Sequence, residues 1–168
     1  VDLLENEPPR VWILNYGIGD QKHAVVGLFN WTDDALEIGA TLERLGLDPN
    51  AVYAGFEYWS DALTQPIRKE LSEHIPARSC RIMALREAGD HPVLLGTSRH
   101  ITQGAVDLLK EQWDPQQASL TGVSRLVAKD PYELRIWTPK AFDGKQVEVL
   151  VSAEDDAAGV TTKVERED

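Results

Sequence analysis

The sequence is poor in the residues that cross-link a small fold or bind metals. Its 168 residues include one cysteine, one methionine and four histidines. The lone Cys80 excludes an internal disulfide, and the histidines show neither His-x-His nor His-x-x-x-His spacing, so no zinc-ligand pattern is present. Gly-rich phosphate loops and the Gly-x-Ser-x-Gly nucleophile motif are also missing, which removes two common catalytic classes. No apolar run approaches the roughly 18 residues that a membrane helix needs.

Basic residues are scarce as well. Lysine and arginine number 17 against 28 aspartates and glutamates, and the formal net charge is −11. Nucleic acids and anionic membranes attract positive charge, so this balance argues against both partners and leaves a neutral ligand such as a sugar compatible. The chain begins Val1-Asp2 with no initiator methionine or leader, which predicts a piece of a longer protein. Its compartment, extracellular or cytoplasmic in a bacterium, stays open.

What the sequence does contain is a series of short β-type segments separated by turn signals. Apolar residues at 36, 38, 40 and 42 alternate with polar or small ones, which favours a half-buried strand over the competing helix. The best helical competitor elsewhere is 103–112. We therefore expect short strands at 11–14, 24–29, 36–43, 52–59, 79–85, 93–96, 105–109, 119–127, 132–137, 147–151 and 160–165.

A polar stretch with both glycine and proline, 86–92, divides the chain into two halves. The strand spacing of roughly 8 to 14 residues is typical of sandwiches. We predict an all-β fold of two consecutive antiparallel β-sandwich domains, Ig-like or Greek-key, at 1–88 and 91–168.

Three segments of the N-terminal half carry a family resemblance. Val-Val-Gly-Leu-Phe-Asn-Trp-Thr-Asp at 25–33, Tyr-Ala-Gly-Phe-Glu-Tyr-Trp at 53–59 and the Pro-containing segment 75–86 resemble, in order and spacing, the region that follows the catalytic barrel in α-galactosidase-like glycoside hydrolases of the melibiase clan. Segments 91–104 and 130–136 resemble pieces found after such domains in some bacterial members. A (β/α)₈ barrel needs about 250 residues. The resemblance therefore implies a non-catalytic C-terminal accessory region that packs on an upstream catalytic domain of the same polypeptide and stabilises it.

Two sets of aromatic residues are candidates for contact with a partner. Trp31, Trp59 and Tyr58 end long apolar runs, so we expect them in the core or at the interface with the missing domain. An oligo- or polysaccharide would stack on exposed tryptophan, which makes a carbohydrate-binding module the alternative function. If Leu134 and Ile136 point inward, then Trp137 shares the outer face with Glu133 and Arg135. The predicted carbohydrate-binding residues are Trp137, Trp113, Arg135 and Glu133.

The remaining polar motifs favour surface roles. Adjacent carboxylates do not form a catalytic pair on a strand, because neighbouring side chains point to opposite faces, so no catalytic residue is assigned. A structural calcium ion held by loop carboxylates is the one cofactor considered, with Asp33, Asp34, Asp155 and Asp156 as its candidate ligands. Asn30-Trp31-Thr32 fits the N-glycosylation pattern, and we interpret it as coincidental. A third, weaker alternative is an Ig-like interaction domain without a ligand.

Overall fold

The structure, a computed structural model, describes residues 1–17 and 22–166. The N-terminal half forms one antiparallel eight-stranded sheet in the order β1-β2-β8-β4-β6-β7-β3, with β5 paired to β4. Its strands are β1 (Val11–Tyr16), β2 (His23–Phe29), β3 (Leu36–Thr41), β4 (Val52–Glu57), β5 (Ala62–Leu63), β6 (Ile67–Arg68), β7 (Glu70–Ile75) and β8 (Cys80–Glu87). The predicted all-β, antiparallel class is confirmed.

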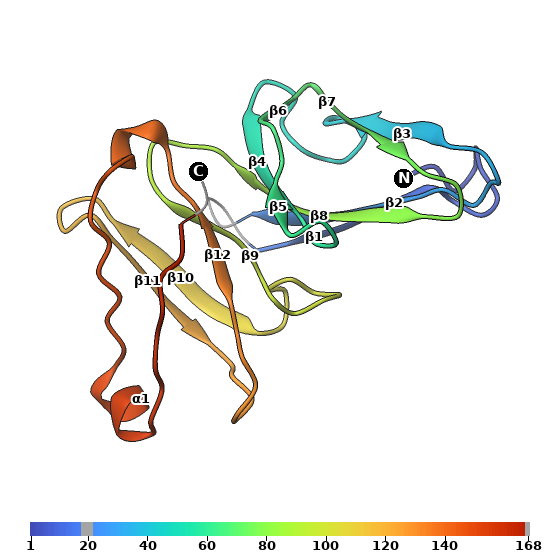
Figure 1. Cartoon of the computed structure of the whole chain (residues 1–168). Coiled ribbons are helices and arrows are strands. Elements are labelled where there is room, and N and C mark those ends of the chain that lie inside the picture. Colours follow the sequence, from blue (N-terminus) through green and yellow to red (C-terminus); the bar gives the residue numbers. More distant parts are fainter. Residues whose placement is uncertain (18–21, 167–168) are drawn as a thin grey trace.

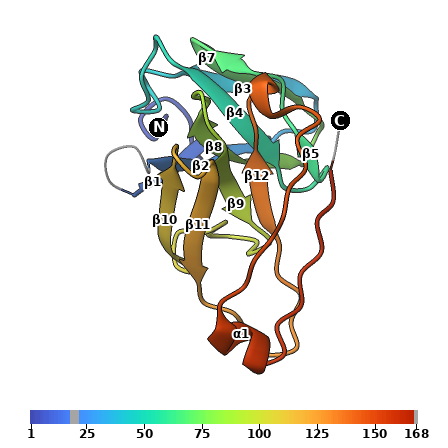
Figure 2. The same cartoon turned by 90° about the vertical axis from the view of Figure 1, so that its left-hand side faces the viewer.

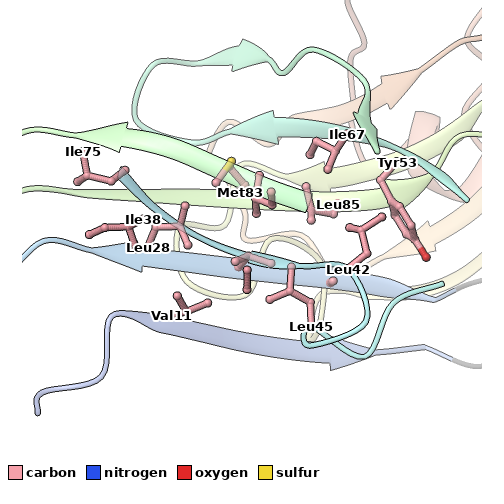
Figure 3. Close-up of a cluster of buried hydrophobic side chains, with 14 residues drawn as sticks. Val11, Leu28, Ile38, Leu42, Leu45, Tyr53, Ile67, Ile75, Met83 and Leu85 are labelled. Carbon is pink, nitrogen blue, oxygen red and sulfur yellow. The ribbon is translucent and has the colours of Figure 1, made fainter. Parts of the chain in front are cut away.

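The eight-stranded sheet folds over itself and so makes both layers of a sandwich. The turning point is the two-residue strand β6, which pairs with β4 only at Val52 and Tyr53 and with β7 only at one position. Strands β3, β6 and β7 therefore lie as a second layer over β1, β2 and β8 (Figure 1). Fully buried Leu28, Ile75 and Met83 fill the space between the layers (Figure 3).

The burial of each strand follows from its position in this sandwich. β3 buries Ile38 and Ala40 and exposes Glu37, as the alternation predicts for a strand covered on one face. β2 is central and is buried at six consecutive residues from His23 to Leu28, because each of its faces is covered along part of its length. The sheet therefore has an inner face on the main core and an outer face that meets the C-terminal half.

The C-terminal half contains two separate two-stranded antiparallel ladders. β9 (Val93–Thr97) pairs with β12 (Leu134–Trp137), and β10 (Leu108–Asp114) pairs with β11 (Ser119–Ser124). A 3₁₀ turn at Lys140–Phe142 and one short helix, α1 (Ala153–Ala157), follow. Figure 2 shows α1 at the end of this half that lies away from the eight-stranded sheet.

The structure corrects several local predictions. The segments 147–151 and 160–165 are in no strand and have no other regular structure, and Val147 and Val149 are exposed. Strand β10 begins only at Leu108, so 105–109 is mostly turn, and β5, β6 and β7 were not predicted. In β12, Leu134 and Ile136 are the exposed residues, which inverts the predicted faces. The alternation itself holds, but the inward face is the one that carries Arg135 over the Phe56 ring and Trp137 against the small core of Phe56 and Val93.

A buried ionic cluster joins the two halves. The guanidinium of Arg86 on β8 donates through Nη1 to Oε2 of Glu111 on β10 (2.6 Å) and to the carbonyl of Leu94 (3.1 Å), and the same nitrogen lies 2.7 Å from Nε2 of His23. The three side chains are at most 7% exposed. Phe56 and Ala54 of β4 also pack with Val93 and Leu95. The division into domains at 1–88 and 91–168 stays a prediction; its last two positions lie outside the described residues.

Candidate functional site

The candidate site is a row of side chains across the outer face of the eight-stranded sheet. Trp12 on β1 lies opposite Gly27 on β2, and Gly27 lies opposite Ile82 on β8. Tyr58, just past the end of β4, continues the row because its backbone N–H donates to the carbonyl of Ile82 (2.8 Å). Val26, Leu28 and Met83, which flank Gly27 and Ile82 in the sequence, belong to the core. Because successive residues of a strand point to opposite faces, the row points outward.

Three aromatic rings gather at the β1 end of this row. Phe29 stacks on Trp31 with centroids 5.2 Å apart and planes within 3°, and Trp12 meets Phe29 edge-on at 5.9 Å. Gly27 makes room for this arrangement, since a Cβ there would lie 2.6 Å from Cε2 of Phe29. Trp12 is 55% exposed and Trp31 is 39% exposed. We call Trp12, Leu14, Phe29, Trp31 and Ile82 the docking patch.

Hydrogen bonds to the backbone hold the indole groups of the docking patch in place. Both Trp12 and Trp31 donate through Nε1 to the carbonyl of Pro9, each at 3.0 Å. The turn that carries Trp31 is fixed by the buried Asn30, whose amide donates to the carbonyls of Asp34, Ile75 and Pro76. The polar atoms of the indoles are thereby used internally, and their apolar surfaces face outward. The same bonds occupy the Asn30 amide that glycosylation would require, in agreement with a coincidental sequon.

A second aromatic group lies at the β4 end of the row. Trp59 is 54% exposed and makes edge-on contacts with Tyr58 and with His100 from the C-terminal half, at 5.3 and 4.8 Å. The carboxylate of Glu57 accepts hydrogen bonds from the backbone N–H groups of Trp59 (3.2 Å) and Ser60 (2.6 Å), which fixes the turn. Burial would raise the pKa of Glu57, but its hydrogen bonds, led by those from Ser60, outweigh burial and lower it, so the carboxylate stays ionised.

Charged groups from both halves surround this second group. The guanidinium of Arg135 lies over the Phe56 ring at 4.1 Å and is 5.4 Å from the Tyr58 ring centre. Its Nη2 contacts carboxylate oxygens of Asp61 (3.1 Å) and Glu133 (3.2 Å). Arg135 is 13% exposed, whereas the two carboxylates are 70% and 65% exposed. We define the Trp59 site as Tyr58, Trp59, Asp61, His100, Glu133 and Arg135.

The structure groups the candidate residues differently from the sequence-based prediction. Tyr58 and Trp59, predicted for a domain interface, lie beside Arg135 and Glu133, predicted for sugar binding. Trp137 and Trp113 are elsewhere: Trp137 packs against the small core of Phe56 and Val93, and Trp113 stacks on His91 at 5.6 Å. Sequence reasoning missed Trp12, His100 and Asp61, because only the sheet pairing and the turns bring them to this face.

The other candidate residues have structural partners. Asp33 forms an exposed ion pair with Arg78 (2.8 Å), and Asp155 bonds Ser152 at the start of α1. Within the described ranges, no group of three or more His, Cys, Asp or Glu side chains is placed to hold a metal ion. Ser98 accepts a hydrogen bond from the backbone N–H of Glu133, and His100 contacts the rings of Tyr58 and Trp59. No helix in residues 1–17 and 22–166 is long and apolar enough to cross a membrane.

The chain belongs structurally to the all-β, antiparallel class, and solved structures similar to part of it include glycoside hydrolases. α-Galactosidase I from Mortierella vinacea is similar over 47% of this chain and 21% of its own, with 15% identity and a TM-score of 0.40. A GH27 β-L-arabinopyranosidase from Geobacillus stearothermophilus is similar over 47% of this chain and 18% of its own, with 13% identity and a TM-score of 0.40. The chain spans about a fifth of the length of these enzymes, so the similarity assigns no activity to it. No protein-family model and no curated protein matches the sequence.

Proposed function

We propose that this chain is a non-catalytic C-terminal accessory region of an α-galactosidase-like glycoside hydrolase, and that its docking patch packs on the upstream catalytic domain. The sequence motifs at 25–33, 53–59 and 75–86 support the parent enzyme. The observation that supports the docking role most directly is that the tryptophans of the docking patch are exposed on the outer face of the sheet.

The C-terminal half covers the outer face only in part. It lies on Ala54 and Phe56 of β4, and it reaches β1 at Tyr16, whose hydroxyl donates to the carbonyl of Gln103 (3.1 Å). The docking patch has no covering layer among the described residues, and Trp12 and Leu14 are 55% and 43% exposed. A sheet face of large apolar side chains gains free energy when a second layer covers it. Covering the exposed parts of the two indoles removes on the order of 200 Å² from water, about 5 kcal/mol before the cost of association.

The path of the N-terminal segment fits an upstream occupant. The amino group of Val1 donates to the carbonyl of Val11 (2.9 Å), and the Asp2 carboxylate accepts hydrogen bonds from the backbone N–H groups of Arg10 and Val11. Residues 1–10 are therefore tied to the start of β1, and Pro9 binds the two indoles of the patch. A domain joined at Val1 would be tethered near the docking patch, where a short linker gives a high effective concentration.

The test is binding in trans between this chain and the separately produced upstream region of its own gene product. Trp31→Ala should weaken that complex at least 30-fold, because a central interface tryptophan contributes about 2 kcal/mol or more. Leu150→Ser is the matched control, since it removes an apolar side chain that is 81% exposed and remote from the patch. Circular dichroism would verify that both variants fold. No complex at micromolar concentrations, or equal weakening by both variants, would reject the docking role.

A further inference from the structure

We propose that the Trp59 site binds a neutral pyranose unit of an oligosaccharide. This inference goes beyond the docking role and concerns the opposite end of the outer row. Three strand spacings of about 4.8 Å separate β1 from β4, so the two ends are on the order of 14 Å apart. One face of the molecule therefore carries two aromatic groups with different surroundings.

The first requirement for sugar binding is a rigid exposed ring. Trp59 exposes about the same fraction of its surface as Trp12, 54% against 55%. Its backbone is held by Glu57, and its ring is supported by Tyr58 and His100 at nearly perpendicular angles of 88° and 67°. These contacts hold the ring in place, while 54% of the Trp59 surface stays exposed. The C–H face of a pyranose can stack on an indole ring presented in this way.

The second requirement is a set of fixed polar groups at the edge of the ring. Arg135 supplies it, because its guanidinium is clamped by the Phe56 ring, by Asp61 and Glu133, and by the carbonyl of Thr97 (3.2 Å). Asp61 and Glu133 remain largely exposed, so their carboxylates can still accept hydrogen bonds from ligand hydroxyls. A few convergent polar groups beside an apolar surface are the usual composition of a small-ligand site.

The charge of the Trp59 site distinguishes it from the docking patch and selects a neutral ligand. No charged side chain belongs to the docking patch, whereas the Trp59 site holds two exposed carboxylates and one arginine. Covering those carboxylates with an apolar protein surface would cost their hydration, which disfavours a second docking area there. The surplus negative charge, on a chain of net charge −11, also disfavours phosphorylated or uronic-acid ligands.

The test is titration of the whole chain with neutral galactans, glucans and mannans and with a polygalacturonate, followed by tryptophan fluorescence and by NMR of the indole N–H groups. We expect saturable binding of at least one neutral glycan at millimolar levels, and none of polygalacturonate. Trp59→Ala should weaken that binding at least tenfold, and Glu133→Gln should weaken it less.

Trp12→Ala is the matched control, because it removes an equally exposed indole from the docking patch and should leave glycan binding unchanged. The inference is overturned if no neutral glycan perturbs the indole signals, or if Trp12→Ala and Trp59→Ala reduce binding equally. Binding to the upstream domain is measured separately, so failure of either role is distinguishable from failure of the other.

Discussion

Replacing Glu111 by glutamine should destabilise the chain strongly at neutral pH and much less in acid. The carboxylate of Glu111 is buried against Arg86 and His23 and accepts a further hydrogen bond from the backbone N–H of Leu94. Burial alone would raise its pKa, but the hydrogen bonds from His23 and Arg86 and the charge of Arg86 lower it to about 2 from 4.5. The ionised carboxylate is therefore favoured in the folded state.

The size and sign of the effect follow from that pKa. A group whose pKa falls on folding stabilises the fold above its unfolded pKa, and that stabilisation is lost as the pH drops toward the folded value. For Glu111 the contribution is about 3 kcal/mol, present above pH 4.5 and lost between 4.5 and about 2. Removing one partner of a buried ion pair costs about 3 to 5 kcal/mol, because the buried charge that remains loses its partner of opposite sign.

His23 acts in the same direction. Burial lowers the pKa of its imidazole below 6.5, outweighing the opposing effect of Glu111. The unfolded chain therefore takes up a proton more readily than the folded chain, and stability falls as the pH drops below 6.5. The Glu111 contribution is isolated only by comparing the variant with the original chain at each pH.

The assay is urea unfolding followed by tryptophan fluorescence and by circular dichroism, between pH 7 and pH 3. We expect Glu111→Gln to lower the free energy of unfolding by about 3 kcal/mol at pH 7, and the difference to shrink toward pH 3. Asp33→Asn is the control. The side chains of Asp33 and Arg78, which form an ion pair, are 83% and 65% exposed, so loss of this pair should leave the urea midpoint nearly unchanged. An unchanged midpoint in Glu111→Gln, or a loss independent of pH, would refute the reasoning.

Three further predictions test the fold and its polar contacts. Gly39→Ala should destabilise the chain by about 2 kcal/mol or more in a thermal scan, because a Cβ there would lie 2.0 Å from the carbonyl oxygen of Leu71 on β7. Asn30→Ala should cost about 2 to 4 kcal/mol in urea unfolding, since it orphans buried carbonyl groups and frees the turn of the docking patch. The pKa of Tyr132 is raised to about 12 by burial and by its hydrogen bond to Asp107, so the difference in alkaline absorbance between the original chain and Tyr132→Phe should titrate near 12. A difference that titrates near the ordinary value of 10 would contradict that contact.

The sequence identified the main strands of the N-terminal half because their local patterns match their surroundings. The alternation in β3 and the apolar run of β2 each correspond to one kind of sheet position. Strand β7 was missed because Glu70–Ile75 is mostly polar and buries only Leu71 and Ile75. At 147–151 the opposite error occurred: alternating valines favour a strand, but no strand among the described residues pairs with this segment.

The candidate site was predictable only in its parts. Tyr58, Trp59, Arg135 and Glu133 were singled out separately, as interface and as sugar-binding residues. Their meeting depends on Arg135 reaching Asp61 and Phe56, contacts that join residues more than 70 positions apart in sequence. Strand β12 turns Arg135 toward Phe56 and leaves Leu134 and Ile136 exposed. Such non-local pairings are decided by the whole fold and leave no periodic trace in a short segment.

The central claim, docking through the patch, is tested most directly by hydroxyl-radical footprinting of the isolated chain and of the complete gene product. Mass spectrometry would give the oxidation rate of each tryptophan. We predict that Trp12 and Trp31 are oxidised readily in the isolated chain and are protected several-fold in the complete protein, while Trp59 reacts alike in both. Equal oxidation of Trp12 and Trp31 in the two forms would contradict the claim.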